Sequence, residues 1–179
     1  EKLLNMIKVL ILTTDTDHHN FFLNNLKIEE ENLFVIYQKK KLKNKYKTSH
    51  KLLKKKEIYE KKIFNNSIFN RNINIKKFFD INSPNTINYI NYIKPKIIII
   101  FGTSILKKKN LKKIKTKILL NLHGGDPENY RGLDSLLWAI FHKDFKRLHT
   151  TLHKVNVKVD TGDIFNSKRI KINKKSSIT

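Results

Sequence analysis

One stretch of this sequence combines the residue types needed to stabilise an oxyanion and move a proton. Asn121, Leu122 and His123 end an apolar run, and Asp160 follows a second one. Because side chains alternate along a strand, Asn121 and His123 point to the same face. An amide donor, an imidazole and a carboxylate are the groups that such chemistry requires. We therefore predict that Asn121, His123 and Asp160 share one reaction centre.

Short apolar runs alternate with helical patterns, which predicts an α/β domain with a mostly parallel, Rossmann-like sheet flanked by helices. Strands are expected at residues 7–12, 33–37, 97–101, 118–122, 148–155 and 168–172. Helices are expected around residues 21–26, from Ser83 and Pro84 to the residue before Pro95, and from Asp134 and Ser135 onward. The carboxyl ends of such strands form a binding crevice. We expect the loops after residues 101 and 123 and the loop before Asp160 to converge there.

Residues 38–77 are rich in lysine and interrupt this pattern. Within them, one marginal amphipathic helix could include Leu52, Leu53, Ile58, Tyr59 and Ile63. The favoured interpretation is a solvated surface insertion, and the alternative is a phosphate-attracting lip on the active-site cleft. No internal repeat or second-domain boundary is visible, so residues 1–179 are interpreted as a single domain.

The formal net charge of +23 would ordinarily suggest a polyanionic partner. The charge is nearly all lysine, however, and asparagine and isoleucine are also abundant. AT-rich coding produces this combination, whereas nucleic-acid readers use arginine and aromatic residues at defined spacings. The composition therefore favours a solvated basic surface, with nucleic acid as the less favoured partner.

Several absences narrow the function further. The chain has no cysteine, which removes disulfides, thiolate catalysis and cysteine-based zinc sites. No apolar run approaches the roughly 20 residues of a membrane span, so we expect a cytoplasmic protein without a membrane partner. His123, His153 and Asp160 match no established zinc spacing, and we predict no metal. The histidines other than His123 are interpreted as hydrogen-bonded structural residues.

The two ends of the chain suggest a segment of a longer protein. The sequence starts at Glu1 without an initiator methionine, and residues 173–179 have the composition of a loop. We therefore expect a truncated C-terminus. The sequence leaves open whether the chain forms a homodimer.

Five short motifs follow one another between residues 121 and 164. They are Asn121-Leu122-His123, Tyr130-Arg131-Gly132, Trp138-Ala139-Ile140, Leu152-His153 and Asp160-Thr161-Gly162-Asp163-Ile164. Together with residues 101–106, this set resembles the catalytic domain of the folate-dependent formyltransferases. That family includes methionyl-tRNA formyltransferase, phosphoribosylglycinamide formyltransferase and the sugar N-formyltransferases. The resemblance covers residues 94–172 well and residues 7–37 more loosely.

The resemblance implies transfer of a formyl group from 10-formyltetrahydrofolate to a primary amine. It implies that Asn121, His123 and Asp160 are the catalytic residues. It also implies a pterin site made by Phe101, Gly102, Thr103, Ser104, Ile105, Leu106, Val155 and Val159. An attacking amine creates an oxyanion that the Asn121 amide and a protonated His123 could stabilise, while Asp160 takes the proton directly or through water.

The acceptor is less well defined, because the chain departs from the best-known members. Residues 124–129 read Gly-Gly-Asp-Pro-Glu-Asn where Pro-Ser-Leu-Leu-Pro is usual, and no glycine-rich phosphate loop follows the first strand. Gly132-Leu133-Asp134 and Trp138 are closer to the sugar enzymes. The favoured acceptor is a nucleotide-linked amino sugar, with methionyl-tRNA or phosphoribosylglycinamide as alternatives. A different class is a non-catalytic polyanion-binding protein on the same fold, whose binding would weaken steeply with salt.

Overall fold

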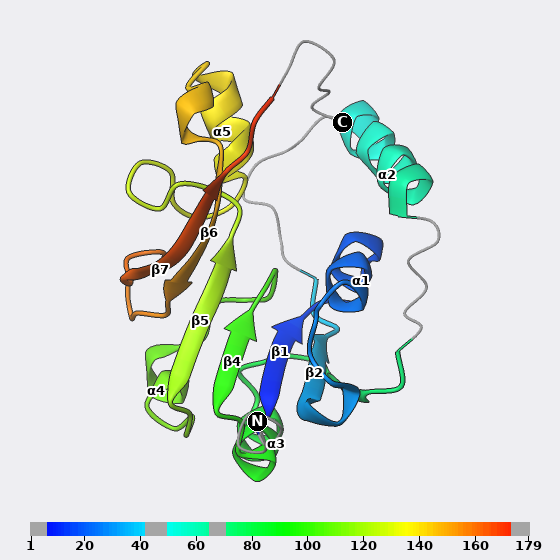
Figure 1. Cartoon of the computed structure of the whole chain (residues 1–179), viewed down its shortest axis with the longest axis vertical. Coiled ribbons are helices and arrows are strands. Elements are labelled where there is room, and N and C mark those ends of the chain that lie inside the picture. Colours follow the sequence, from blue (N-terminus) through cyan, green and yellow to red (C-terminus); the bar gives the residue numbers. More distant parts are fainter. Residues whose placement is uncertain (1–6, 42–49, 65–70, 173–179) are drawn as a thin grey trace.

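A seven-stranded sheet with the order β3-β2-β1-β4-β5-β6-β7 forms the centre of the molecule (Figure 1). The computed structural model describes residues 7–41, 50–64 and 71–172. The strands are β1 (Val9–Thr13), β2 (Leu33–Gln38), β3 (Asn74–Phe78), β4 (Ile97–Ile100), β5 (Ile118–His123), β6 (His149–Lys154) and β7 (Ile164–Arg169). Neighbouring strands from β3 through β2, β1 and β4 to β5 pair in parallel. Strands β6 and β7 add antiparallel pairings at one edge. The predicted mostly parallel α/β fold is confirmed.

Helices cover both faces of the sheet. They are α1 (Asp17–Asn24), α2 (His50–Phe64), α3 (Pro84–Ile93), α4 (Lys108–Leu111) and α5 (Ser135–Phe141), with 3-10 turns η2 (Glu30–Asn32) and η3 (Phe145–Arg147). The alternation of β1 separates two cores: Leu10 and Leu12 pack on the α3 face, and Val9 and Ile11 on the α1 face. Among the described residues, no helix is both long and apolar enough to cross a membrane.

Helix α3 begins and ends where the sequence predicts. The Ser83 hydroxyl accepts a hydrogen bond from the Thr86 N–H at 3.2 Å, and Pro84 occupies the first turn. Lys94 ends the helix in the left-handed region, with φ of 54°, immediately before Pro95. The helix buries Ile87, Ile90 and Ile93, and full burial of such a side chain contributes about 1.5–3 kcal/mol.

The lysine-rich stretch contains a strand that the sequence analysis missed. Strand β3 pairs in parallel with β2, so residues 74–77 of the predicted insertion belong to the central sheet. Its residues are mostly polar because β3 is an edge strand, where lysine also discourages pairing with another chain. The predicted amphipathic helix corresponds to α2, although Ile58, Tyr59 and Ile63 are exposed. Residues 42–49 and 65–70 lie outside the described residues.

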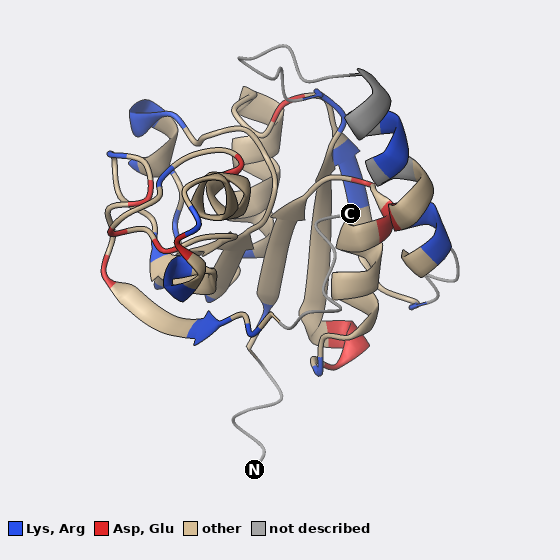
Figure 2. Cartoon of the chain, turned by 90° about the horizontal axis from the view of Figure 1, so that it is seen from above, with Lys and Arg blue, Asp and Glu red and all other residues tan. Residues whose placement is uncertain are grey.

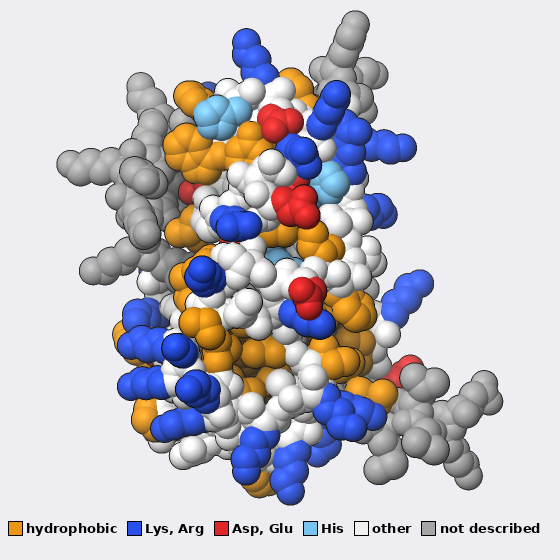
Figure 3. Space-filling view, turned by 90° about the vertical axis from the view of Figure 1, so that its left-hand side faces the viewer, with side chains coloured by type: hydrophobic (Ala, Val, Ile, Leu, Met, Phe, Trp, Pro, Cys, Tyr) orange, Lys and Arg blue, Asp and Glu red, His pale blue; other side chains and the backbone are white. Residues whose placement is uncertain are grey.

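The last strand begins earlier than predicted. Strand β7 spans Ile164–Arg169 rather than residues 168–172, and it pairs with β6 through an irregularity at Leu152 and His153. All six residues of β7 are exposed, so no apolar alternation marked it in the sequence. Hydrophobic side chains are visible on the face of the molecule that Figure 3 shows. Phe141 on α5 and Phe165 on β7 are among the exposed hydrophobic residues.

Candidate active site

The three residues predicted to share a reaction centre lie together at the carboxyl edge of the sheet. Asn121 and His123 end β5, and Asp160 lies in the loop that connects β6 to β7. The Asn121 Nδ2 donates to Asp160 Oδ1 at 3.3 Å, and His123 Nδ1 lies 3.6 Å from Asp160 Oδ2. One carboxylate therefore contacts both the amide and the imidazole.

Asp160 is held in place by its own loop. Its backbone has φ of 50°, a left-handed conformation that aspartate tolerates better than most residues. The Lys154 N–H donates to the Asp163 carbonyl at 2.9 Å and closes the loop. Gly162 is required by this closure, since an added Cβ would lie 1.8 Å from the Lys154 carbonyl oxygen. The loop therefore fixes where the Asp160 carboxylate points.

The surroundings of Asp160 keep it ionised. Its side chain is 7% exposed, and burial alone raises the pKa of a carboxyl group. Hydrogen bonds from His153 and from the Gly132 N–H, together with the nearby His123, outweigh burial and lower the pKa of Asp160. The Gly132 N–H donates to Asp160 Oδ2 at 2.8 Å. Asp160 therefore acts as a hydrogen-bond acceptor on both oxygens.

His153 is a fourth member of this cluster, which the sequence analysis interpreted as a structural residue. It lies opposite Asn121 in the β5–β6 pairing, and its Nε2 is 3.3 Å from Asp160 Oδ1. Its Nδ1 donates to the Lys154 carbonyl at 2.8 Å. Burial lowers the pKa of His153, but the hydrogen bonds to Asp160 and to the Lys154 carbonyl raise it overall. The signal in the sequence was the motif Leu152-His153, whose partner across the sheet only the strand register reveals.

His123 is buried between two acceptors. Its Nε2 lies 3.1 Å from the Tyr130 carbonyl oxygen, and its Nδ1 faces Asp160. An imidazolium has an N–H on each nitrogen and can donate to both oxygens. Gly125 lies against the ring, and an added Cβ there would be 2.7 Å from His123 Nε2. To donate to a substrate oxygen, the His123 ring must give up its contact with either the Tyr130 carbonyl or Asp160.

The loop after His123 has a fixed shape. Asp126 is buried and accepts hydrogen bonds from the Glu128 N–H at 3.1 Å, Asn129 Nδ2 at 2.9 Å and Arg147 Nη1 at 3.0 Å. Burial raises the pKa of Asp126, but these hydrogen bonds and the Arg147 charge lower it overall. Thr151 on β6 also donates to the Gly125 carbonyl at 2.9 Å. The loop whose sequence departs from the usual one is therefore an ordered structure beside the Asn121–His123–Asp160 cluster.

A cleft of about 1060 Å³ opens at this edge of the sheet. Asn121, His123, His153 and Asp160 all line it. All of the residues predicted for the pterin line it as well: Phe101, Gly102, Thr103, Ser104, Ile105, Leu106, Val155 and Val159. Beneath Gly102, the buried His19 ring packs against Phe101 with centroids 4.4 Å apart, so the 101–106 loop rests on an aromatic base. Within the described parts of the chain, no group of three or more potential ligands is arranged to hold a metal ion.

Comparison with known proteins agrees with the fold. Residues 7–179 match the model of the formyl transferase family, and the chain belongs to that family. The bifunctional polymyxin resistance protein ArnA of Wigglesworthia glossinidia brevipalpis is 33% identical over 98 residues, which are 55% of this chain and 15% of ArnA. The methionyl-tRNA formyltransferase of Methylacidiphilum infernorum is 30% identical over 91 residues, 51% of this chain and 28% of that protein. The chain thus matches less than a third of either relative's length.

A solved structure supports the same fold. The crystal structure of phosphoribosylglycinamide formyltransferase from Anaplasma phagocytophilum superposes with a TM-score of 0.61. The two sequences are 15% identical, and the superposition covers 96% of this chain and 75% of that chain. At this identity the likeness concerns the fold.

Proposed function

We propose that this domain transfers a formyl group from 10-formyltetrahydrofolate to a primary amine. The observation that carries the proposal is the Asp160 carboxylate held between Asn121 and His123 in the wall of the cleft. Pockets for single drug-sized ligands measure about 300–1,000 Å³, so a cleft of about 1060 Å³ has room for parts of both substrates. Membership of the formyl transferase family supports the folate donor.

The cluster provides the groups that the reaction needs. Attack of the amine nitrogen on the formyl carbon forms a C–N bond and moves the carbonyl electron pair onto oxygen. The Asn121 amide and a protonated His123 stabilise that oxyanion. Collapse of the intermediate breaks the bond to the donor nitrogen and yields the formamide and tetrahydrofolate. The proton that the donor nitrogen gains balances the one that the amine loses.

The lowered pKa of Asp160 determines at which step of the reaction its carboxylate accepts the amine proton. A weakly basic carboxylate removes a proton poorly from a neutral amine. Attack converts that amine into a positively charged and far more acidic nitrogen. Asp160, directly or through water, then takes the proton after the C–N bond has formed. His153 contributes by holding Asp160 in this ionised state.

The acceptor that we favour is a nucleotide-linked amino sugar. Its support is the similarity of Gly132-Leu133-Asp134 and Trp138 to the sugar enzymes, and Gly132, Leu133 and Asp134 line the cleft. Formylation of methionyl-tRNA is the second candidate, supported by the 30% identical relative of that name. Both candidates carry phosphate groups on the acceptor, so the cleft should accommodate negative charge in either case.

A panel assay tests the proposal directly. The full-length protein is incubated with 10-formyltetrahydrofolate and, separately, with amino-sugar nucleotides, methionyl-tRNA and phosphoribosylglycinamide. We expect formylation of an amino-sugar nucleotide and calorimetric binding of a folate analogue by folded protein. Formylation of methionyl-tRNA alone would refute the sugar acceptor. No turnover and no folate binding, with polyanion binding that falls steeply with salt, would identify the non-catalytic class.

A further inference from the structure

The wall of the cleft formed by β2 and β3 is basic. Lys39, Lys40 and Lys41 follow β2, Lys77 lies in β3, and all four line the cleft. Figure 2 looks down on this edge and shows blue segments, which mark lysine and arginine, on the side of the sheet where β2, β3 and α2 lie. Asp15, after β1, also lines the cleft and pairs with Lys77. This wall is separate from the Asn121–His123–Asp160 cluster.

The backbone that carries these lysines is held firmly. The Lys39 N–H donates to the Phe78 carbonyl and the Lys40 N–H to the Phe79 carbonyl, both at 2.8 Å. Gln38 is 3% exposed, and its amide donates to the Lys40 carbonyl at 2.8 Å. The same amide accepts from the Ser104 N–H at 3.3 Å, which ties the lysines to the 101–106 loop. Such a platform presents charge at a low entropic cost of ordering.

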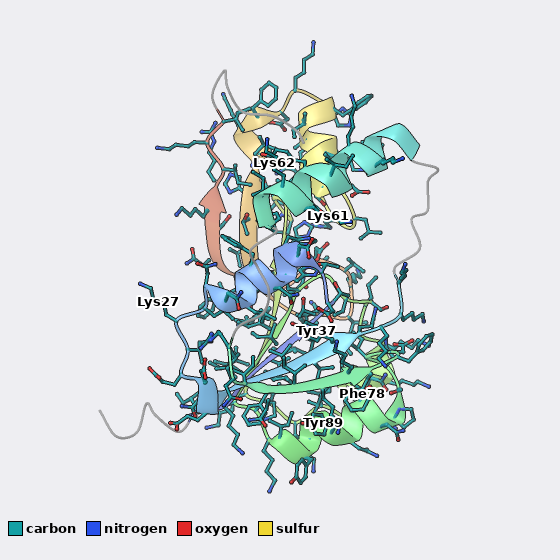
Figure 4. The ribbon with its side chains drawn as sticks, turned by 90° about the vertical axis from the view of Figure 1, so that its right-hand side faces the viewer. Lys27, Tyr37, Lys61, Lys62, Phe78 and Tyr89 are labelled. Carbon is teal, nitrogen blue, oxygen red and sulfur yellow. The ribbon has the colours of Figure 1, made fainter. Side chains whose placement is uncertain are left out.

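The four lysines differ in what already neutralises them. Lys40 pairs with Asp80 at 2.7 Å, and Lys77 pairs with Asp15 at 2.7 Å. The Lys77 ammonium also lies over the Tyr37 ring, 5.5 Å from its centroid, where β2 and β3 run side by side (Figure 4). In the described part of the chain, no carboxylate lies within ion-pair distance of Lys39 or Lys41. These two exposed ammonium groups can bind an incoming anion without first breaking a pair.

The strand order sets the distance between this wall and the reaction centre. Strands β1 and β4 separate β2 from β5, and three spacings of about 4.8 Å place the two strand ends about 14 Å apart. The flexible stem of a lysine shortens that gap. An anion bound here therefore belongs to a part of the substrate that is remote from the reacting amine.

We propose that Lys39 and Lys41 form a subsite for a phosphate or diphosphate group carried by the acceptor. Lysine binds phosphate as a point charge, and two ammonium groups match the charge of a phosphate better than that of a single carboxylate. Assignment of the anion to the acceptor rests on the proposed formyl transfer. The phosphate would anchor the acceptor so that its amine reaches Asp160, which makes Lys39 and Lys41 binding rather than catalytic residues.

A pair of matched double variants tests the subsite. Lys39→Gln with Lys41→Gln removes the two cleft lysines. Lys54→Gln with Lys55→Gln makes the same charge change at exposed positions of α2 that do not line the cleft. Binding of inorganic pyrophosphate to the full-length protein is measured by calorimetry at low salt, and KM and kcat are measured with the phosphorylated acceptor.

We expect the cleft variant to lose roughly tenfold in pyrophosphate affinity, since each exposed ion pair contributes up to about 1 kcal/mol. Its KM for the acceptor should rise by a similar factor at unchanged kcat, and the α2 variant should stay within about twofold of the wild type. Equal weakening in both variants, or unchanged pyrophosphate affinity in the cleft variant, would overturn the subsite. The subsite would also be overturned if the cleft variant bound the tail of the folate more weakly and pyrophosphate normally.

The binding measurement needs no turnover. Loss of pyrophosphate affinity in the cleft variant would therefore support the subsite even if no acceptor is formylated, in which case the proposed function fails alone. Normal formyl transfer with unaltered pyrophosphate binding and acceptor KM in that variant would reject the subsite and leave the proposed function intact.

Discussion

His153 Nε2 lies 3.3 Å from Asp160 Oδ1, while the other carboxylate oxygen, Oδ2, faces His123. The carboxylate is therefore held between two imidazoles, one from each of the neighbouring strands β6 and β5. This arrangement accounts for the opposite pKa shifts of the pair: that of Asp160 is lowered and that of His153 is raised. It also means that a change at His153 acts on the chemistry through Asp160.

Replacement of Asp160 by Asn should abolish most formyl transfer. The substitution removes the charge that accepts the amine proton but keeps the shape of the side chain. Asparagine also tolerates the left-handed backbone at this position, so the fold and folate affinity should be retained. Steady-state kinetics, with circular dichroism and folate calorimetry as controls, check this expectation. Near-normal turnover at every pH would make Asp160 a turn residue and refute the mechanism.

Replacement of His123 by Ala should lower kcat by about 10²–10³, the usual cost of losing one preorganised donor to an oxyanion. Combination with Asp160→Asn should cost much less than the product of the two single losses, because residues that act as a unit are not additive. Single-turnover rates of the two variants and of the double variant measure the coupling. Fully multiplicative losses would show that the two residues act independently.

The stability contributed by the His153–Asp160 pair should depend on pH with a defined sign. The pKa of His153 is raised above 6.5, so its contribution is complete below that value and is lost as pH rises through the folded pKa. The pKa of Asp160 is lowered below 3.8, so its contribution is present above that value and is lost as pH falls through the folded pKa. The pair should therefore stabilise most between these two reference values.

The variant His153→Gln tests this dependence. Its loss of unfolding free energy, measured by urea denaturation, should be larger at about pH 5.5 than at about pH 8.5. The control is His149→Gln on the same strand, whose partly buried ring hydrogen-bonds to the Ser167 hydroxyl at 3.0 Å. An equal loss at both pH values for His153→Gln would show that its imidazole keeps one charge state throughout.

Adjacent glycines in the loop after β5 should respond very differently to alanine. At Gly125 a Cβ would lie 2.6 Å from the Ser135 Cβ and 2.7 Å from His123 Nε2, so the His123 ring or α5 must move. We expect Gly125→Ala to cost about 1–3 kcal/mol in stability and to lower kcat. At Gly124 the nearest atom is a Leu136 methyl at 3.6 Å, an ordinary contact, which makes Gly124→Ala the matched control. Equal activity of the two variants would contradict the tight packing of His123.

Local pattern was sufficient to predict the strands buried on both faces. Residues 97–101 are a continuous apolar run, and such a run has few alternatives to a buried parallel strand. Residues 118–122 are apolar except for Asn121. Helix α3 was predictable because Ser83, Pro84 and Pro95 mark its ends through short-range backbone effects. Alternation along β5 likewise placed Asn121 and His123 on one face before any contact was known.

Pairing between distant segments determined the parts of the fold and of the site that local pattern did not predict. Strands β3 and β7 lie toward the edges and expose polar residues, so their identity depends on the partner strand and not on their own pattern. The position of His153 beside Asp160 follows from the antiparallel register of β5 and β6, which no local spacing encodes. The lysines after β2 look solvated in the sequence, and they line the cleft because Gln38 and β3 fix the path of the chain there. Contacts between distant segments depend on the whole folded chain, and they placed these groups around one cleft.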